Sequence, residues 1–125
     1  RDWLYVDDHV DCLLTIAFKG KAGKSYCIGG GEEKTNIELA NLICNQLDDR
    51  FPASRPHSDL IKFVKDRPGH DLRYSMDASK IKDEFGWVAS HRFDQGIIKT
   101  VDWYVNNLSW CEKFISSNSF PHLLC

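Results

Sequence analysis

The sequence predicts a small α/β domain in which a few short strands are covered by helices. Short strand-like segments alternate with stretches whose apolar residues recur at helical spacing, and this alternation is typical of the α/β class. A chain of 125 residues, 42% of them hydrophobic, is long enough for one domain with a buried core. We expect that domain over residues 1–115 and a loosely structured tail over residues 116–125.

The first part of the chain predicts a strand, a helix and a second strand. Residues 2–6 are strand-like, and Asp7 and Asp8 after them are suitable caps for a helix that ends at Gly20. Residues 25–28 indicate a second short strand, followed by a turn of three glycines at 29–31. The apolar residues of the helix recur with the period of one buried face: Val10, Leu13, Leu14, Ala17 and Phe18.

The middle of the chain predicts a helix with a clear start. Thr35 and Glu38 fit the capping box, in which each side chain satisfies the other residue's backbone N–H, and the helix should end near residues 48–50. Residues 51–59 contain two prolines and suit a surface loop. Alternating apolar residues predict a strand over 60–64, and residues 66–71 interrupt regular structure.

The last part of the chain predicts an extended piece over 72–76, a short helix that ends at Gly86, and a long final helix. Apolar residues keep the helical period from Phe93 to Leu108, so we expect this helix to be the longest of the chain. Trp103 and Trp110 add aromatic surface that we expect to pack rather than to bind a ligand.

Composition argues against several classes of function. The net charge of -2 argues against a nucleic-acid partner. No uncharged apolar run approaches the roughly 20 residues of a membrane-spanning helix, which argues against a membrane partner. The five cysteines are widely spaced without a C-x-x-C pair, and the histidines lack the spacing of metal ligands. We therefore expect reduced thiols in a cytoplasmic protein and no metal site.

Arg67 is the first candidate for ligand binding. The proline after it restricts the loop, and the glycine after that proline allows a ligand to approach closely. A guanidinium held in this way can present a forked donor to a phosphate, and the ring of His70 can hydrogen-bond or stack beside it. The alternative is a surface arginine in an ion pair with Asp66 or Asp71.

Arg1 and Asn36 are further candidates. Arg1 supplies a second cation for a diphosphate if the ends of two predicted strands converge; the alternative is an ordinary chain terminus. Asn36 lies at a predicted helix start, where free N–H groups favour anions; the alternative is an ordinary helix start whose N–H groups are satisfied by the Asn36 amide.

The glycines at 29–31 match no dinucleotide or phosphate-loop spacing. No poised nucleophile or acid–base set is evident, so we expect no catalytic or cofactor-binding residue.

Five stretches, in order, resemble the C-terminal part of the dTDP-glucose 4,6-dehydratase family, a branch of the extended short-chain dehydrogenases/reductases. They are R-D-W-L-Y-V-D-D-H at 1–9, Y-C-I-G-G at 26–30, D-R-P-G-H-D-L-R-Y at 66–74, F-G-W at 85–87 and K-T-V-D-W-Y at 99–104. The third and fifth stretches are the ones that distinguish this family from relatives that act on other nucleotide sugars.

The resemblance implies a small C-terminal substrate-binding domain whose partner, a Rossmann domain, lies outside this chain. By resemblance, Arg1, Asn36, Arg67 and His70 contact the diphosphate of dTDP-glucose. The family's NAD-binding G-x-x-G-x-x-G and its catalytic Tyr-x-x-x-Lys do not occur in the sequence. The implied reaction oxidises the sugar at C4 with NAD, removes water across C5 and C6, and returns the hydride to C6. The whole enzyme is implied to be a homodimer.

We therefore interpret the chain as the nucleotide-sugar-binding part of a longer lyase, inactive by itself. Two alternatives stay open. One is the same domain of a nucleotide-sugar epimerase or decarboxylase, and the other is a binding module without chemistry.

Overall fold

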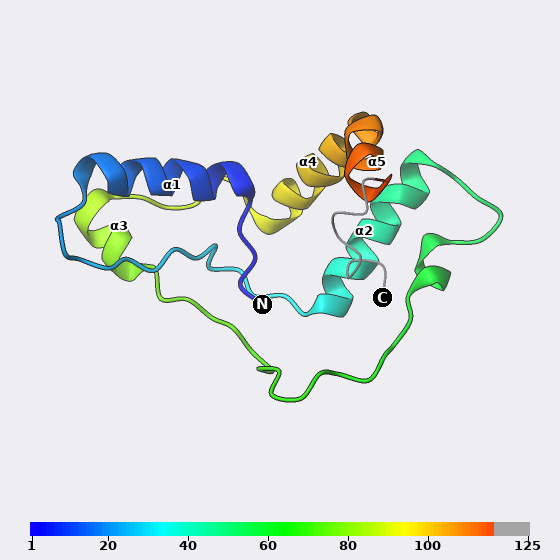
Figure 1. Cartoon of the computed structure of the whole chain (residues 1–125), viewed down its shortest axis with the longest axis horizontal. Coiled ribbons are helices and arrows are strands. Elements are labelled where there is room, and N and C mark those ends of the chain that lie inside the picture. The colour runs from blue at the N-terminus through cyan, green and yellow to red at the C-terminus, as the bar shows by residue number, and fades with distance from the viewer. Residues whose placement is uncertain (117–125) are drawn as a thin grey trace.

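The computed structural model describes residues 1–116, which form helices joined by irregular segments (Figure 1). The elements are α1 (Val6–Lys19), α2 (Asn36–Arg50), the 3₁₀-helix η1 (His57–Leu60), α3 (Ser79–Phe85), α4 (Phe93–Asn106) and α5 (Leu108–Ser116). The predicted helices that end at Gly20, near residue 50 and at Gly86 are confirmed. The tail predicted over 116–125 lies, apart from the last residue of α5, outside the described residues.

The helices form two groups (Figure 1). One group is α1 with α3. The other is α2, α4 and α5, in which α4 contacts both α2 and α5, and α2 also contacts η1. Arg50 at the end of α2 donates to Asp102 of α4, with Nε 2.9 Å from Oδ1. Residues 1–5 run between the two groups.

A small core lies between α1 and α3. Cys12 and Ile81 are fully buried and pack with Trp87, whose indole N–H donates to Asp11 over 2.9 Å. Within residues 1–116 the buried hydrophobic residues are only Cys12, Ile81, Trp87 and Val101. The structure is therefore more open than the compact domain that the sequence predicts.

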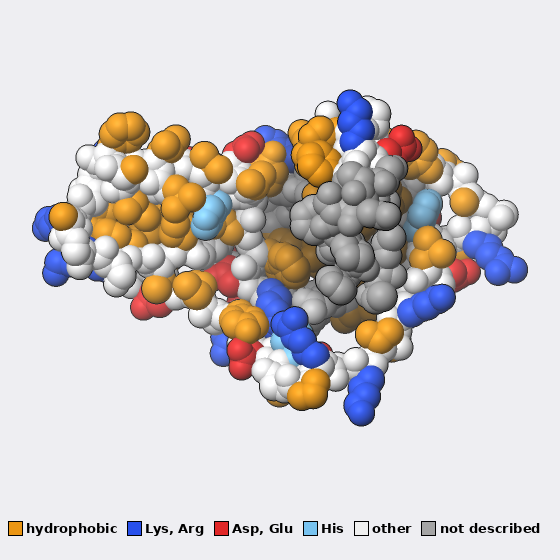
Figure 2. Space-filling model, viewed as in Figure 1, with side chains coloured by type: hydrophobic (Ala, Val, Ile, Leu, Met, Phe, Trp, Pro, Cys, Tyr) orange, Lys and Arg blue, Asp and Glu red, His pale blue; other side chains and the backbone are white. Residues whose placement is uncertain are grey.

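The prediction that the apolar stripe of α1 is buried is wrong. Leu13, Leu14 and Phe18 are 48%, 52% and 84% exposed. The helix is rotated so that Asp8 and Cys12 are its buried residues, because Cys12 packs against α3. Figure 2 shows the resulting row of hydrophobic side chains along α1. A group of exposed apolar side chains on one helix face is typical of a surface that binds another protein segment.

The predicted strands are not observed. Within residues 1–116 the only strand-type pairing is an isolated antiparallel bridge between Asp2 and Glu33. The segment predicted as a strand at 60–64 begins at the end of η1, and its Phe63 and Val64 are 87% and 85% exposed. A strand needs a neighbour along its length that satisfies its backbone groups. Pairing at the N-terminus is confined to residues 1–2 with 33–34, and no pairing forms at residues 60–64. The predicted α/β fold is thus corrected to a mostly helical one over the described residues.

The predicted long final helix is two helices. α4 ends at Asn106, and the side-chain amide of Asn107 donates to the carbonyl of Trp103 over 2.7 Å. An asparagine that occupies a carbonyl of the last turn competes with helix continuation. α2, with 15 residues, is therefore the longest helix of residues 1–116. The break brings the rings of Trp103 and Trp110 edge to face, with centroids 5.2 Å apart.

No disulfide joins the cysteines of the described residues. Cys12, Cys27, Cys44 and Cys111 are free thiols, and Cys125 lies outside the described residues. Residues 1–116 contain no cluster of His, Cys, Asp and Glu side chains that could hold a metal ion. Among the same residues, no helix has the length and apolar character needed to cross a membrane.

Tyr5, not Asp7 or Asp8, occupies the N-cap position of α1, which corrects the predicted cap.

Hydrogen bonds to Asp8 join α1 to the segment before α4. Asp8 is only 3% exposed and accepts from Ser90 Oγ, His91 N and His91 Nδ1 over 3.0, 2.9 and 2.9 Å. Burial by itself raises the pKa of Asp8, but the hydrogen bonds from His91 and Ser90 together outweigh burial and lower it.

We predict that Asp8→Ala destabilises the chain by about 2–3 kcal/mol at neutral pH, because donors on Ser90 and His91 lose their acceptor. The folded pKa is lowered, so this contribution is present above the unfolded pKa of about 4 and is lost as the pH falls through the folded value. Urea unfolding at pH 7 and at pH 3 measures both effects. Equal unfolding free energies of the variant and the unaltered chain at pH 7 would contradict the prediction.

Candidate functional site

The N-terminal segment is fixed against residues 30–34. The carboxylate of Asp2 accepts from the backbone N–H groups of Gly30 and Gly31 over 3.0 and 3.1 Å. The backbone N–H of Lys34 donates to the carbonyl of Arg1 over 3.0 Å, and the Lys34 carbonyl accepts from the Arg1 amino group and the Trp3 indole. These contacts place Arg1 next to the first turn of α2.

The glycine run makes this close approach possible. A Cβ on Gly29 would lie 2.5 Å from a carboxylate oxygen of Asp2 and 2.9 Å from Cβ of Met76. A Cβ on Gly30 would collide with the backbone carbonyl of Trp3. Both glycines are therefore needed for contact between two backbone segments, and the neighbouring protein occupies the space that a phosphate would need.

We predict that Gly30→Ala destabilises the structure by about 2 kcal/mol or more, because the Trp3 backbone must move. Gly31→Ala is the matched control. Its Cβ would meet open space, and only its φ of 73° imposes a cost, about 1–2 kcal/mol. Thermal unfolding of both variants measures the difference. A smaller loss for Gly30→Ala than for Gly31→Ala would show that the close approach is not a constraint.

A cavity of about 530 Å³ lies between the N-terminal segment, the start of α2 and the loop before residue 74. We call it the Arg1 cavity. It brings together three of the four predicted site residues, since Arg1, Asn36 and His70 all line it. Arg67 is not among the lining residues, although its loop forms one wall. The complete lining is Arg1, Glu33, Lys34, Thr35, Asn36, Ile37, Glu38, Asp66, His70, Asp71, Leu72 and Arg73.

The guanidinium of Arg1 is held by neutral groups. One nitrogen donates to Nε2 of His70, and another lies 3.4 Å from the carbonyl oxygen of Leu72. The guanidinium carbon is 4.6 Å from the centre of the Tyr74 ring, in the geometry of a cation–π contact. Within residues 1–116 Arg1 forms no side-chain ion pair with a carboxylate, so its charge is not neutralised.

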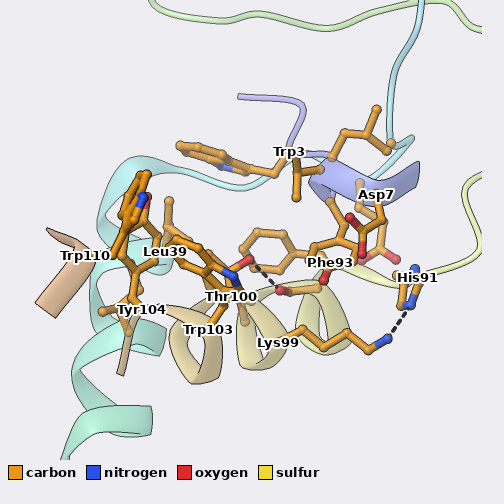
Figure 3. A pocket seen from close by; sticks show the side chains of 18 residues that line it. Trp3, Asp7, Leu39, His91, Phe93, Lys99, Thr100, Trp103, Tyr104 and Trp110 are labelled. Atoms are coloured by element: carbon orange, nitrogen blue, oxygen red, sulfur yellow. Dashed lines mark hydrogen bonds between the residues drawn. The ribbon is translucent and has the colours of Figure 1, made fainter. Parts of the chain in front are cut away.

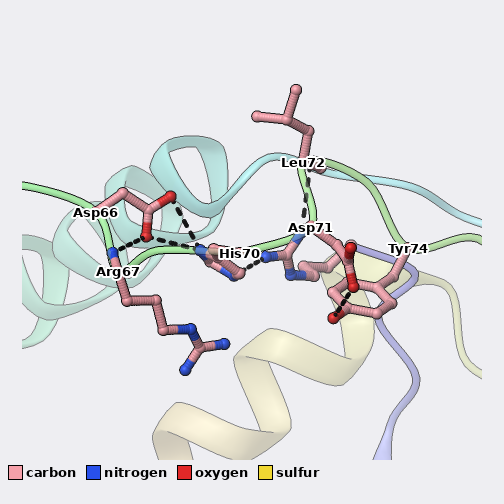
Figure 4. A network of polar contacts seen from close by, with 7 residues as sticks. Asp66, Arg67, His70, Asp71, Leu72 and Tyr74 are labelled. Atoms are coloured by element: carbon pink, nitrogen blue, oxygen red, sulfur yellow. Dashed lines mark hydrogen bonds and ion pairs between the residues drawn. The ribbon is translucent and has the colours of Figure 1, made fainter.

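His70 is in turn held by Asp66. Nδ1 of His70 lies 2.8 and 3.0 Å from the two carboxylate oxygens of Asp66, and Figure 4 shows this chain of contacts. The hydrogen bond from His70 lowers the pKa of Asp66. Asp66 also accepts from the backbone N–H of Arg67 over 2.8 Å. The Arg67 side chain lies clear of the His70 ring in Figure 4 and makes no ion pair within the described residues.

Each carboxylate that lines the Arg1 cavity already has a donor. Glu33 is bound by Arg73 through two contacts of 2.6 Å, and this bond lowers the pKa of Glu33 to about 2. Asp71 accepts from the hydroxyl of Tyr74 over 2.6 Å. Asp66 is bound by His70, as described, and Glu38 by Thr35. The acids are thus engaged by other partners while Arg1 keeps its charge available to a ligand.

Asn36 begins α2 but does not cap it. Thr35 is the N-cap, because its hydroxyl accepts from the Glu38 backbone N–H over 3.2 Å while Glu38 accepts from the Thr35 N–H over 2.7 Å. The predicted capping box is confirmed. Asn36 lies at an ordinary helix start, as the alternative states, but the cap is the Thr35 hydroxyl and not the Asn36 amide. Asn36 is exposed at the cavity wall, near the N–H groups of the first turn.

A second cavity of about 620 Å³ was not indicated by the sequence analysis. Figure 3 shows this aromatic cavity, formed where residues 3–7 meet α2, α4 and α5. Trp103, Tyr104 and Trp110 line it and are 46%, 53% and 49% exposed, although their rings also contact one another. The two tryptophans, Trp103 and Trp110, are the feature of the sequence that could have indicated this cavity. Their contact depends on the break between α4 and α5, which the sequence analysis did not predict.

Comparison with known proteins decides the family. A family model described as GDP-mannose 4,6 dehydratase matches residues 1–100 of the chain. The chain belongs to this family. It is 47% identical over 120 residues to a dTDP-glucose 4,6-dehydratase of Xanthomonas campestris pv. campestris, covering 94% of this chain and 34% of that relative. The resemblance stated from the sequence motifs is therefore confirmed.

Solved structures agree with this membership. A dTDP-glucose 4,6-dehydratase from Bacillus anthracis in complex with NAD matches with a TM-score of 0.76 and 40% identity. The enzyme from Streptomyces venezuelae, with NAD and TYD bound, matches with a TM-score of 0.77 and 38% identity. Each match covers 88% of this chain and 32% of the solved chain. The chain thus spans about a third of the length of the relatives that it matches.

Proposed function

We propose that this chain is the nucleotide-sugar-binding part of a dTDP-glucose 4,6-dehydratase and that the Arg1 cavity holds the diphosphate of the substrate. The observation that carries the proposal is the Arg1 guanidinium, held by neutral acceptors in a cavity whose carboxylates are engaged elsewhere. A diphosphate needs more than one forked donor. Arg67, exposed on the adjoining loop, supplies the second guanidinium in this proposal.

Two further residues complete the proposed site. Asn36 adds an amide donor beside the first turn of α2, where unpaired backbone N–H groups attract an anion. The resemblance implies that His70 contacts the diphosphate. Because both of its ring nitrogens already have partners, we propose instead that His70 orients the Arg1 guanidinium. The relatives' names support dTDP-glucose as the substrate.

NAD belongs to the proposed whole enzyme, but the residues of this chain do not fit it. The glycines at 29–31 pack against Asp2 and Trp3 and cannot cradle a pyrophosphate. The sequence carries neither the dinucleotide-binding glycine motif nor Tyr-x-x-x-Lys. The proposed role of this chain is therefore to bind substrate, with NAD binding and catalysis supplied by residues outside it. The homodimer and the cytoplasmic location implied by the resemblance belong to the same proposal.

We predict that Arg1→Ala and Arg67→Ala each weaken binding of dTDP-glucose by about 1.5–3 kcal/mol, because each removes a charge-assisted contact to phosphate. Titration calorimetry with the 125-residue chain measures this effect. Arg55→Ala is the matched control, since Arg55 is exposed in the loop before η1 and does not line the cavity. Equal losses in all three variants, or none in Arg1→Ala, would contradict the proposed site.

The name of the matching family model favours one second candidate, a guanosine nucleotide sugar. The same titration with GDP-mannose and UDP-glucose distinguishes the candidates. Preference for dTDP-glucose supports the proposal, preference for GDP-mannose supports the second candidate, and preference for UDP-glucose indicates the epimerase or decarboxylase alternative.

A further inference from the structure

We propose that Asp66 is a positioning residue: through the ring of His70 it fixes the guanidinium of Arg1 in the orientation that receives the ligand's phosphate. This inference rests on the proposed function of the Arg1 cavity. It adds a residue that the sequence analysis considered only as a possible ion-pair partner of Arg67.

The argument begins with the hydrogen-bonding capacity of the three groups. An ionised carboxylate only accepts, a guanidinium only donates, and a neutral imidazole has one donor nitrogen and one acceptor nitrogen. Asp66 accepts from Nδ1 of His70, so Nδ1 carries the proton and Nε2 carries the lone pair. Nε2 is the atom that contacts the Arg1 guanidinium. Asp66 therefore selects the one neutral form of His70 that can hold Arg1.

The other neutral form of His70 would break the arrangement. Its Nε2–H would face an N–H of Arg1, so two donors would oppose each other. Its bare Nδ1 would face the carboxylate of Asp66, so two acceptors would also oppose each other. Because this second tautomer loses both contacts, the orientation of Arg1 depends on a residue that does not touch it.

The imidazole also keeps a negative charge away from Arg1. A direct ion pair between Asp66 and Arg1 would neutralise the guanidinium and compete with a phosphate. With His70 between them, Arg1 is fixed by a neutral acceptor, by the Leu72 carbonyl and by the ring of Tyr74. The guanidinium is thus held in place while its charge stays available, which is the state that an anion-binding residue needs.

Asp66 also organises the loop that carries the other proposed phosphate ligand. Its Oδ1 accepts from the backbone N–H of Arg67 as well as from His70. Its side chain is 65% exposed, whereas that of His70 is 21% exposed. The carboxylate is therefore on the outer side of the ring, and His70 transmits its effect inward to Arg1.

The test uses three variants of the 125-residue chain. Asp66→Ala removes both acceptor oxygens. Asp66→Asn removes the charge but keeps one acceptor oxygen for His70 and Arg67. Asp71→Asn removes the same charge from the same cavity and keeps an acceptor for the Tyr74 hydroxyl, without touching His70. Nitrogen NMR of the His70 ring without ligand reports the tautomer, and calorimetry with dTDP reports binding.

We predict that Asp66→Ala shifts His70 away from the form protonated at Nδ1 and weakens dTDP binding about tenfold. Asp66→Asn should restore most of both. Asp71→Asn should leave the tautomer unchanged and bind dTDP more tightly, because a negative charge near the phosphates is gone. An unchanged tautomer in Asp66→Ala would overturn the proposal, and so would tighter dTDP binding by Asp66→Ala, which is what loss of charge alone produces.

The proposal and the proposed function can fail separately. If the unaltered chain does not bind dTDP, the proposed function fails. The tautomer of His70 in Asp66→Ala, measured without ligand, still decides whether Asp66 sets the ring.

Discussion

The site depends on the close contact between the first three residues and the glycine turn at 29–31. Asp2 binds two backbone N–H groups of this turn, and Gly30 leaves room for the Trp3 carbonyl. The two segments are distant in the sequence, because the contacting residues are 27 to 29 positions apart. It sets Arg1 beside the start of α2, and from there the guanidinium reaches His70, 69 residues further along the chain.

Hydrogen bonds and ion pairs around the Arg1 cavity are the reason why we propose an anion site in a chain of net negative charge. Of the groups that line the Arg1 cavity, Glu33 is bound by Arg73, Asp66 by His70 and Asp71 by the Tyr74 hydroxyl. The bonds from Arg73 and His70 lower the pKa values of Glu33 and Asp66, and none of the three carboxylates forms an ion pair with Arg1 within residues 1–116. The electrostatics that matter are therefore those of a few oriented side chains, and the net charge of -2 does not reveal them.

The sequence predicted the features that depend on neighbouring residues. Thr35 and Glu38 marked the start of α2 because their contact spans three positions. The sequence did not predict the outward-facing stripe of α1, because periodicity shows that Leu13 and Phe18 share a face but not what covers it. Three of the residues that the motifs indicated line the cavity. The contact of Arg1 with His70 could not be predicted, because it joins residues 69 positions apart. The strand prediction failed at residues 60–64 because alternation without a partner segment does not form a sheet.

The central claim is that the Arg1 cavity, and not the aromatic cavity, binds the nucleotide diphosphate. The most direct measurement is an amide and indole NMR titration of the chain with dTDP-glucose. The account predicts that the largest shifts fall on residues 34–38 and 66–73, with the indole signals of Trp103 and Trp110 little changed. Shifts centred on Trp103 and Trp110, with residues 34–38 and 66–73 unmoved, would contradict it.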